Sequence, residues 1–395
     1  MLNRNFDMRG QTRDAGIRNK KLVTYGIVRA PRLIENTVTS RMLGLNACQQ
    51  ACAVEEMMRL TRRQFCSTPV VAAAASIAFN KHVFAQRSKI GMKMGGNLST
   101  DHPAMLAMEK ACERIRKQSD GDIDIQFYNN LQLGSEPSMH SQLRSGALEL
   151  MTTSGLILQT LVPIAGISGM AFAFRDYPQV WAALDGDLGA EVRGNMQKFG
   201  IYGFPKNMDN GFRNVTTSTK PINVVDDLKG LKIRVPPSPV WVTLFTALGA
   251  SPTSINLNEL YTSLQTKVVD AQENPLVLIE AGKFYEVQRY CSMTSHLWDG
   301  CWPIANAKIW KALPADAQAL ISRVFDEETL KQREDAARLN VELEAALKEK
   351  GMVFNRPEKD QFRERLSKAG FYGDWKKKYG PQAWAILEKY VGTLS

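Results

Sequence analysis

The chain has 395 residues and a formal net charge of +10 at pH 7, with 44% hydrophobic and 23% charged residues. This composition excludes a largely disordered chain, and the length suits two lobes better than one small domain. Residues 1–86 hold 13 Lys and Arg against 5 Asp and Glu, which leaves 37 basic and 35 acidic residues in 87–395. Since the positive excess belongs to the N-terminal segment, composition gives no support for a nucleic-acid-binding surface.

The first pattern along the chain is that of an export signal. Arg62 and Arg63 form a paired-arginine motif, residues 69–79 form a short Ala-rich apolar stretch, and 83–85 offer a signal-peptidase site. The order of these regions is typical of a secretory signal, and the arginine pair resembles a twin-arginine export motif. The alternative is a buried Ala-rich helix with two incidental arginines. We predict a twin-arginine-type signal peptide at 57–86 and a periplasmic mature protein.

Residues 1–56 have neither the periodicity of a domain nor the features of a signal. Met57 and Met58 immediately precede Arg59 and would give the signal a conventional basic start. We therefore interpret 1–56 as an extension that is either upstream of the true start codon or disordered.

Cysteine usage agrees only loosely with export. Removal of the signal leaves Cys112, Cys291 and Cys301, an odd number that excludes a complete disulfide framework. Cys291 and Cys301 pairing in the periplasm is one interpretation, and free buried thiols are the one we favour.

The mature chain begins with alternating strand and helix patterns. The predicted elements are a strand at 89–94, a helix at 104–118, a strand at 123–127, a helix at 137–145 and a strand at 148–153. This order predicts an α/β lobe with a largely parallel sheet.

The pattern restarts after residue 210. The predicted elements are a strand at 211–217, a turn at 225–230, a strand at 231–235, helices at 240–248 and 258–266, and a strand end at 268–272. We assign lobe I to 87–210 plus about 299–338, and lobe II to 211–298 plus about 339–395.

The C-terminal third is predicted to be mainly helical. Residues 314–350 contain neither Gly nor Pro after Pro314, and Gly351 is a plausible C-cap. A helix of this length would span roughly 50 Å at 1.5 Å per residue, so we expect it to cross between the lobes. Residues 358–392 are also expected to be helical. The predicted fold is α/β and two-lobed, with mixed, mostly parallel sheets flanked by helices.

Motifs for catalysis are few. His102, His140 and His296 are not paired at metal-ligand spacing, and the mature chain has no Cys-x-x-Cys, Gly-x-Ser-x-Gly or phosphate-binding glycine loop. We therefore predict no catalytic residue, no metal and no cofactor, although missing motifs do not by themselves exclude an enzyme.

Arg234 is the leading candidate for binding an acid. Lys232 and Arg234 share one face of a predicted strand that Pro236 ends, which places Arg234 at the edge where open α/β sheets bind ligands. A guanidinium group offers a fork of donors that matches a carboxylate. The spacing fits a surface arginine on an edge strand equally well.

An ordered series of short segments connects residues 87–395 to a known family. The segments are Asp101-His-Pro, Gln132-Leu-Gly-Ser-Glu136, Gly211-Phe-Arg213, Asp227-Leu-Lys-Gly-Leu-Lys-Ile-Arg234-Val-Pro, Leu248-Gly-Ala-Ser-Pro252, Glu259-Leu-Tyr261 and Val269-Asp270-Ala-Gln-Glu-Asn274-Pro275. No single segment is decisive, but together they resemble the DctP-type solute-binding proteins of tripartite ATP-independent periplasmic (TRAP) transporters.

The resemblance implies a monomeric periplasmic protein that closes around a small mono- or dicarboxylate. It also implies delivery of that acid to TRAP permease membrane subunits for ion-coupled uptake. Arg234 would form the carboxylate salt bridge, Arg213 would assist it, and Asn274 would act as a neutral donor. The opposite wall of the site would be lined by Thr153, Ser154 and Gly155.

Other residues are weaker candidates. Trp241 and Trp298 are predicted to flank the aliphatic or aromatic part of the acid, with packing between the lobes as the alternative. Asp299 and His102 are candidates for binding a hydroxyl or keto oxygen, with a structural role as the alternative. The chain departs from the family at Lys267, where glycine is frequent, and we interpret this as surface variation.

Alternative functions remain open at this stage. One is a binding protein of the same fold that serves a sensor, and another is a periplasmic enzyme with a redox or metal cofactor.

Overall fold

The computed structural model describes residues 89–395, and every structural statement below refers to them. The predicted extension at 1–56 and the predicted signal peptide at 57–86 lie outside the described residues. Within 89–395, no helix is both long enough and apolar enough to cross a membrane.

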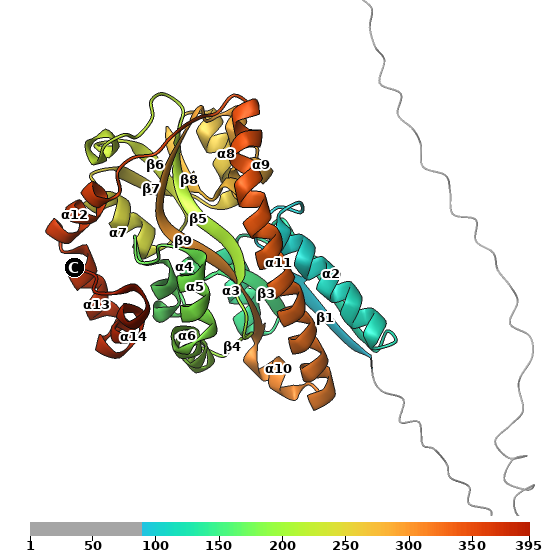
Figure 1. The fold of residues 1–395 in the computed structure, drawn as a ribbon. Coiled ribbons are helices and arrows are strands. Elements are labelled where there is room, and N and C mark those ends of the chain that lie inside the picture. The colour runs from blue at the N-terminus through green and yellow to red at the C-terminus, as the bar shows by residue number, and fades with distance from the viewer. Residues whose placement is uncertain (1–88) are drawn as a thin grey trace, which may run out of the picture. The chain divides into compact units, whose positions relative to one another are not determined.

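A mixed sheet of ten strands runs through the described residues (Figure 1). Eight strands follow the order β2-β1-β3-β9-β5-β8-β6-β7, while β4 and β10 pair with β9. The strands are β1 Ile90–Gly95, β2 Ile123–Tyr128, β3 Leu150–Ser154, β4 Ile201–Gly203, β5 Met208–Thr217, β6 Lys232–Val235, β7 Ser251–Ser254, β8 Ala271–Asn274, β9 Tyr290–Asn306 and β10 Val353–Asn355.

The middle of the sheet joins the two strand groups that the sequence predicts. β1 pairs in parallel with β2 and β3 at one end, and β6 pairs in parallel with β7 and β8 at the other. Between them, β5 and β9 are antiparallel to each other and to their neighbours β8 and β3. The mixed α/β fold is therefore confirmed, whereas the residue boundaries of the two lobes stay a prediction.

Helices cover the sheet on both sides. Their bounds are α2 Pro103–Gln118, α3 Glu136–Ser145, α4 Gly155–Leu158, α5 Tyr177–Asp185, α6 Asp187–Lys198, α7 Pro239–Ala247, α8 Leu257–Gln265, α9 Leu276–Ala281, α10 Ala307–Ala312, α11 Ala315–Glu349, α12 Asp360–Lys368, α13 Phe371–Tyr379 and α14 Pro381–Val391. One apolar core cluster packs beneath α2, α9 and α11, and a second packs beneath α5, α6, α7 and α12–α14.

The long C-terminal helix is confirmed as α11, with 35 residues. It lies against α2 and α9, which belong to the two predicted lobes, and it crosses β5 between them (Figure 1). At the crossing, the Gln332 amide accepts from the Asp209 backbone N–H (2.9 Å) and donates to its carbonyl oxygen (2.8 Å). The helix is thus attached to the strand where β5 departs from regular pairing with β9.

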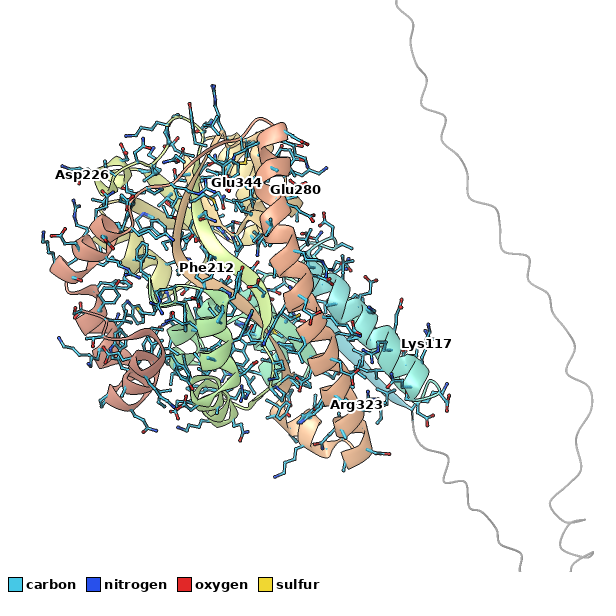
Figure 2. The ribbon with its side chains drawn as sticks, in the orientation of Figure 1. Lys117, Phe212, Asp226, Glu280, Arg323 and Glu344 are labelled. Atoms are coloured by element: carbon cyan, nitrogen blue, oxygen red, sulfur yellow. The ribbon has the colours of Figure 1, made fainter. Side chains whose placement is uncertain are left out.

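Many of the charged side chains lie on the outside of this framework. Figure 2 shows Lys117 at the outer end of α2, Arg323 in the N-terminal part of α11 and Asp226 at the periphery, while Phe212 lies near the central strands. Cys112, Cys291 and Cys301 are free and buried, as the sequence favoured.

The structure adds detail to two local predictions. Residues 358–392 are helical but form three helices, because the chain turns at Gly370 and Gly380, whose φ angles of 72° and 86° favour glycine. Lys267 follows α8 with a φ of 60°, so the turn that favours glycine is kept with lysine in it.

Candidate ligand-binding cavity

A cavity opens where the carboxyl ends of the parallel strands from both groups meet. In this structure, about 30 Å³ of the cavity can be occupied by solvent-sized groups. Its lining comprises Asn97, Leu98, Leu131, Glu136, Ser154, Ile157, Asn210, Arg213, Arg234, Pro236, Pro237, Trp241, Asn256, Leu257, Asn274, Leu278 and Asp299. Ligands of open α/β sheets bind at this kind of edge.

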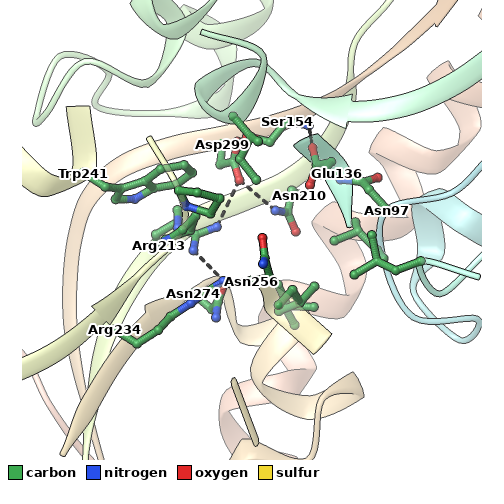
Figure 3. A pocket seen from close by; sticks show the side chains of 17 residues that line it. Asn97, Glu136, Ser154, Asn210, Arg213, Arg234, Trp241, Asn256, Asn274 and Asp299 are labelled. Carbon is green, nitrogen blue, oxygen red and sulfur yellow. Dashed lines mark hydrogen bonds and ion pairs between the residues drawn. The ribbon is translucent and has the colours of Figure 1, made fainter. Parts of the chain in front are cut away.

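Strand ends supply the polar lining from both groups of strands (Figure 3). Ser154 and Asn274 are the last residues of β3 and β8, and Arg234 is the third residue of β6. Arg213 and Asp299 come from the middle of β5 and β9, the strands that both groups share.

Arg213 is paired with protein carboxylates. Its Nε donates to Glu273 Oε2 at 2.6 Å and its Nη2 to Glu273 Oε1 at 2.8 Å, which is a bidentate ion pair. Its Nη1 donates to Asp299 Oδ2 at 3.0 Å. Burial opposes the charge, but Glu273 and Asp299 raise the pKa of Arg213 above its ordinary value. The positive charge of Arg213 is therefore balanced by the carboxylates of Glu273 and Asp299.

Arg234 is equally buried, at 2% exposed, but has no such pairing. Its Nε donates to the backbone carbonyl of Ile255 at 2.8 Å, and no carboxylate among residues 89–395 forms an ion pair with it. Burial, followed by the nearby charge of Arg213, lowers the pKa of Arg234 to about 9, so the group remains positive at pH 7. A buried unpaired cation is costly, and an anion at the cavity side of this guanidinium would offset that cost.

The opposite wall carries acceptors. Glu136, the first residue of α3, accepts from the Ser154 backbone N–H and the Thr153 hydroxyl, both at 2.7 Å. Burial raises the pKa of Glu136 to about 7. Asp299 accepts from Ser154 Oγ at 2.7 Å and from the Asn210 amide at 3.0 Å, and burial raises its pKa despite Arg213.

Most of the predicted ligand-binding residues line the cavity. They are Ser154, Arg213, Arg234, Trp241 and Asn274. The centre of the Trp241 ring lies 4.8 Å from the Arg213 guanidinium carbon. Trp241 therefore stabilises the charge of Arg213 by a cation–π contact in addition to lining the cavity. Ligand contact by these residues stays a prediction.

Three predicted ligand-binding residues do not line the cavity, because each is engaged by protein groups. Thr153 donates to Glu136 and lies 2.7 Å from His140 Nε2. Gly155 is packed against the protein, because a Cβ atom at this position would lie 2.8 Å from the backbone oxygen of Ala165. Trp298 donates through Nε1 to Asp209 at 2.8 Å and packs edge-on against Trp181.

Sequence reasoning missed much of the polar wall. Asn97, Asn210 and Asn256 line the cavity without having been predicted, and Glu136 was noted only as the end of a family segment. Asp299 does line the cavity, whereas His102 instead contacts Asn210 at 3.2 Å and caps α2. Among residues 89–395, no three His, Cys, Asp or Glu side chains are arranged to hold a metal ion.

Comparison with known proteins now decides the family. Residues 94–370 match the DctP model, described as bacterial extracellular solute-binding protein, family 7. The chain belongs to the DctP family. Its members are periplasmic solute-binding proteins that work with TRAP permeases.

Known DctP proteins support this assignment across most of the chain. The sialic acid-binding periplasmic protein SiaP of Vibrio cholerae is 30% identical over 276 residues, which cover 70% of this chain and 85% of SiaP. A TRAP solute-binding protein of Haemophilus influenzae with bound L-gulonate is 29% identical, with a TM-score of 0.71 over 76% of this chain and 99% of that one. The sugar acid-binding protein DctPAm of Advenella mimigardefordensis, in complex with galactonate, is 28% identical, with a TM-score of 0.73 over 77% and 98%.

Proposed function

We propose that this DctP protein captures a small organic acid in the cavity, holding its carboxylate through Arg234, and delivers it to a TRAP permease for ion-coupled uptake. The observation that carries the proposal is the buried guanidinium of Arg234, which has no ion-pair partner among the described residues. The relatives named above bind sialic acid, L-gulonate and galactonate, all of which carry a carboxylate.

Arg234 and Arg213 have different roles in this proposal. The two Nη nitrogens of Arg234 have no partner among the described residues, and together they match the two oxygens of a carboxylate. Arg213 instead orders the site, because its Nη2 also donates to Asn274 Oδ1 at 2.6 Å. This bond holds the Asn274 amide in place, so one of its N–H groups can donate to the ligand.

Binding is proposed to take place without chemistry on the ligand. The closed state would gain from pairing Arg234 with the acid, and the shift towards closure equals the difference in ligand affinity between closed and open forms. Export through a twin-arginine signal at 57–86 and a monomeric state belong to the same proposal.

The test is a screen of organic acids by thermal shift, followed by calorimetry, on the wild-type protein and Arg234→Ala. Saturation at a hundredfold excess over Kd should stabilise the wild-type protein by about 2.7 kcal/mol. Arg234→Ala should weaken binding by about 30-fold or more, because a charge pair buried with the ligand is lost. Arg144→Ala, at an exposed position of α3, is the matched control and should bind normally. Unchanged affinity in Arg234→Ala would falsify the mechanism.

A further inference from the structure

The charges that line the cavity are unevenly placed. The lining includes four charged residues, which are Glu136, Arg213, Arg234 and Asp299. Figure 3 shows Arg234 on one side, next to Asn274, and Glu136 with Asn97 on the other. The two sides also come from different elements, since Arg234 belongs to β6 whereas Glu136 begins α3.

Among the described residues that line the cavity, pairing within the protein leaves one cation for a ligand. Arg213 is bonded to Glu273 through two nitrogens and to Asp299 through the third. The side of the cavity that holds Glu136 therefore has no positive side chain without a protein carboxylate. Arg234 can meet one ligand carboxylate, and among the lining residues no equivalent group meets a second.

The Glu136 side is built for hydrogen-bond donors instead. Glu136 is 7% exposed, and its carboxyl accepts hydrogen bonds from the Thr153 hydroxyl and the Ser154 backbone N–H. Asp299 lies on the same side and already accepts from Ser154 and Asn210. Hydroxyl groups of a ligand can donate to carboxylate and amide oxygens, whereas a carboxylate there would face like charge in a buried space.

We infer that the cavity selects hydroxylated monocarboxylates and discriminates against dicarboxylates of the same chain length, with Glu136 as the specificity-determining residue. The inference rests on the proposed function, because it takes the ligand carboxylate at Arg234 as its starting point. A dicarboxylate bound at Arg234 places its second carboxylate towards Glu136 and Asp299. Repulsion between these negative charges weakens its binding.

Matched pairs of sugar acids isolate this effect. L-gulonate and D-glucarate differ only in whether the terminal carbon is an alcohol or a carboxylate, and D-galactonate and galactarate differ in the same way. Calorimetry at pH 8 should give each dicarboxylate an affinity about tenfold or more below that of its monocarboxylate partner. A like charge at close range disfavours a second carboxylate by about a factor of ten or more.

Glu136→Gln assigns the effect to its residue. Glutamine keeps the size and the acceptor oxygen but removes the charge, so the affinity for D-glucarate and galactarate should rise and the ratio within each pair should narrow severalfold. Glu113→Gln makes the same change at an exposed position of α2 and should leave every ratio as in the wild-type protein. If Glu136→Gln does not fold, the wild-type ratios still decide the outcome.

The outcomes separate this inference from the function beneath it. Equal affinities within both wild-type pairs, or tighter binding of succinate than of either monocarboxylate, overturn the inference while leaving acid capture by Arg234 intact. A Glu136→Gln protein that folds and keeps the wild-type ratios overturns the role of Glu136. Failure of every organic acid to bind overturns the proposed function itself.

Discussion

Arg213 and Arg234 lie in the same cavity lining and are both 2% exposed, yet the protein treats their charges differently. Arg213 is bonded to Glu273, Asp299 and Asn274, whereas within residues 89–395 Arg234 donates only to a backbone carbonyl. The pKa values follow this difference, raised for Arg213 and lowered to about 9 for Arg234. The comparison indicates that one arginine organises the site and that the other is kept for the ligand.

The strongest test of the comparison is Arg213→Met. This change leaves Glu273 and Asp299 buried without their cation, so we expect the free energy of unfolding to fall by about 3–5 kcal/mol. Urea unfolding of the ligand-free protein measures it. A loss below about 1 kcal/mol would show that the two carboxylates do not depend on Arg213.

Arg234→Met should have the opposite effect on the stability of the ligand-free protein. Removing an unpaired buried cation should leave the ligand-free protein as stable as the wild-type protein or more stable, by up to about 4 kcal/mol, because desolvation of the charge is relieved. Organic-acid binding should be lost at the same time. Urea unfolding without ligand checks the first expectation, and a marked loss of stability would mean that Arg234 has a structural partner after all.

The pH dependence of stability tests the other side of the cavity. The pKa of Glu136 is raised from 4.5 to about 7, so the folded protein binds a proton more tightly than the unfolded chain. This contribution is fully present below pH 4.5 and is lost as pH rises through 7, by an amount on the order of 3 kcal/mol. Relative to Glu136→Gln, wild-type stability should therefore fall between pH 5 and 8. A pH-independent difference between the two proteins would contradict the assignment.

Lys267→Gly gives the smallest expected effect and separates stability from binding. Glycine relieves the positive φ angle at this exposed turn but adds freedom to the unfolded chain, so the net gain should be no more than about 1 kcal/mol. Ligand affinity should not change. Glu113→Gly, within α2, is the matched control and should lose about 1 kcal/mol. A change in affinity caused by Lys267→Gly would show that the turn is coupled to the cavity.

Much of the fold could be predicted because its patterns are local. The helix face of α2 that carries Met105 and Met108, and the Gly- and Pro-free stretch of α11, can be read within a few turns of sequence. β9 was missed because it is buried on both faces. Cys301 and Ala305 belong to one apolar cluster and Trp302 and Ile304 to the other, so the second half of the strand has no polar alternation.

The candidate site was predictable in part. Arg234, Asn274 and Ser154 end or nearly end their strands, and a family resemblance was enough to single them out. The partners of Arg213 were not predictable, because Glu273 and Asp299 are 60 and 86 residues away along the chain. Glu136 looked like the acidic first residue of a helix, where a carboxylate is ordinary.

The sequence by itself determined the α/β class, the long helix, the DctP resemblance and the choice of Arg234 as the residue that would bind an acid. Each depends on residue types at short spacings. Only the tertiary structure decided which arginine is left without a carboxylate and which carboxyl groups face it across the cavity. Charge pairing in a buried site depends on distances of a few ångströms between side chains that the fold alone brings together.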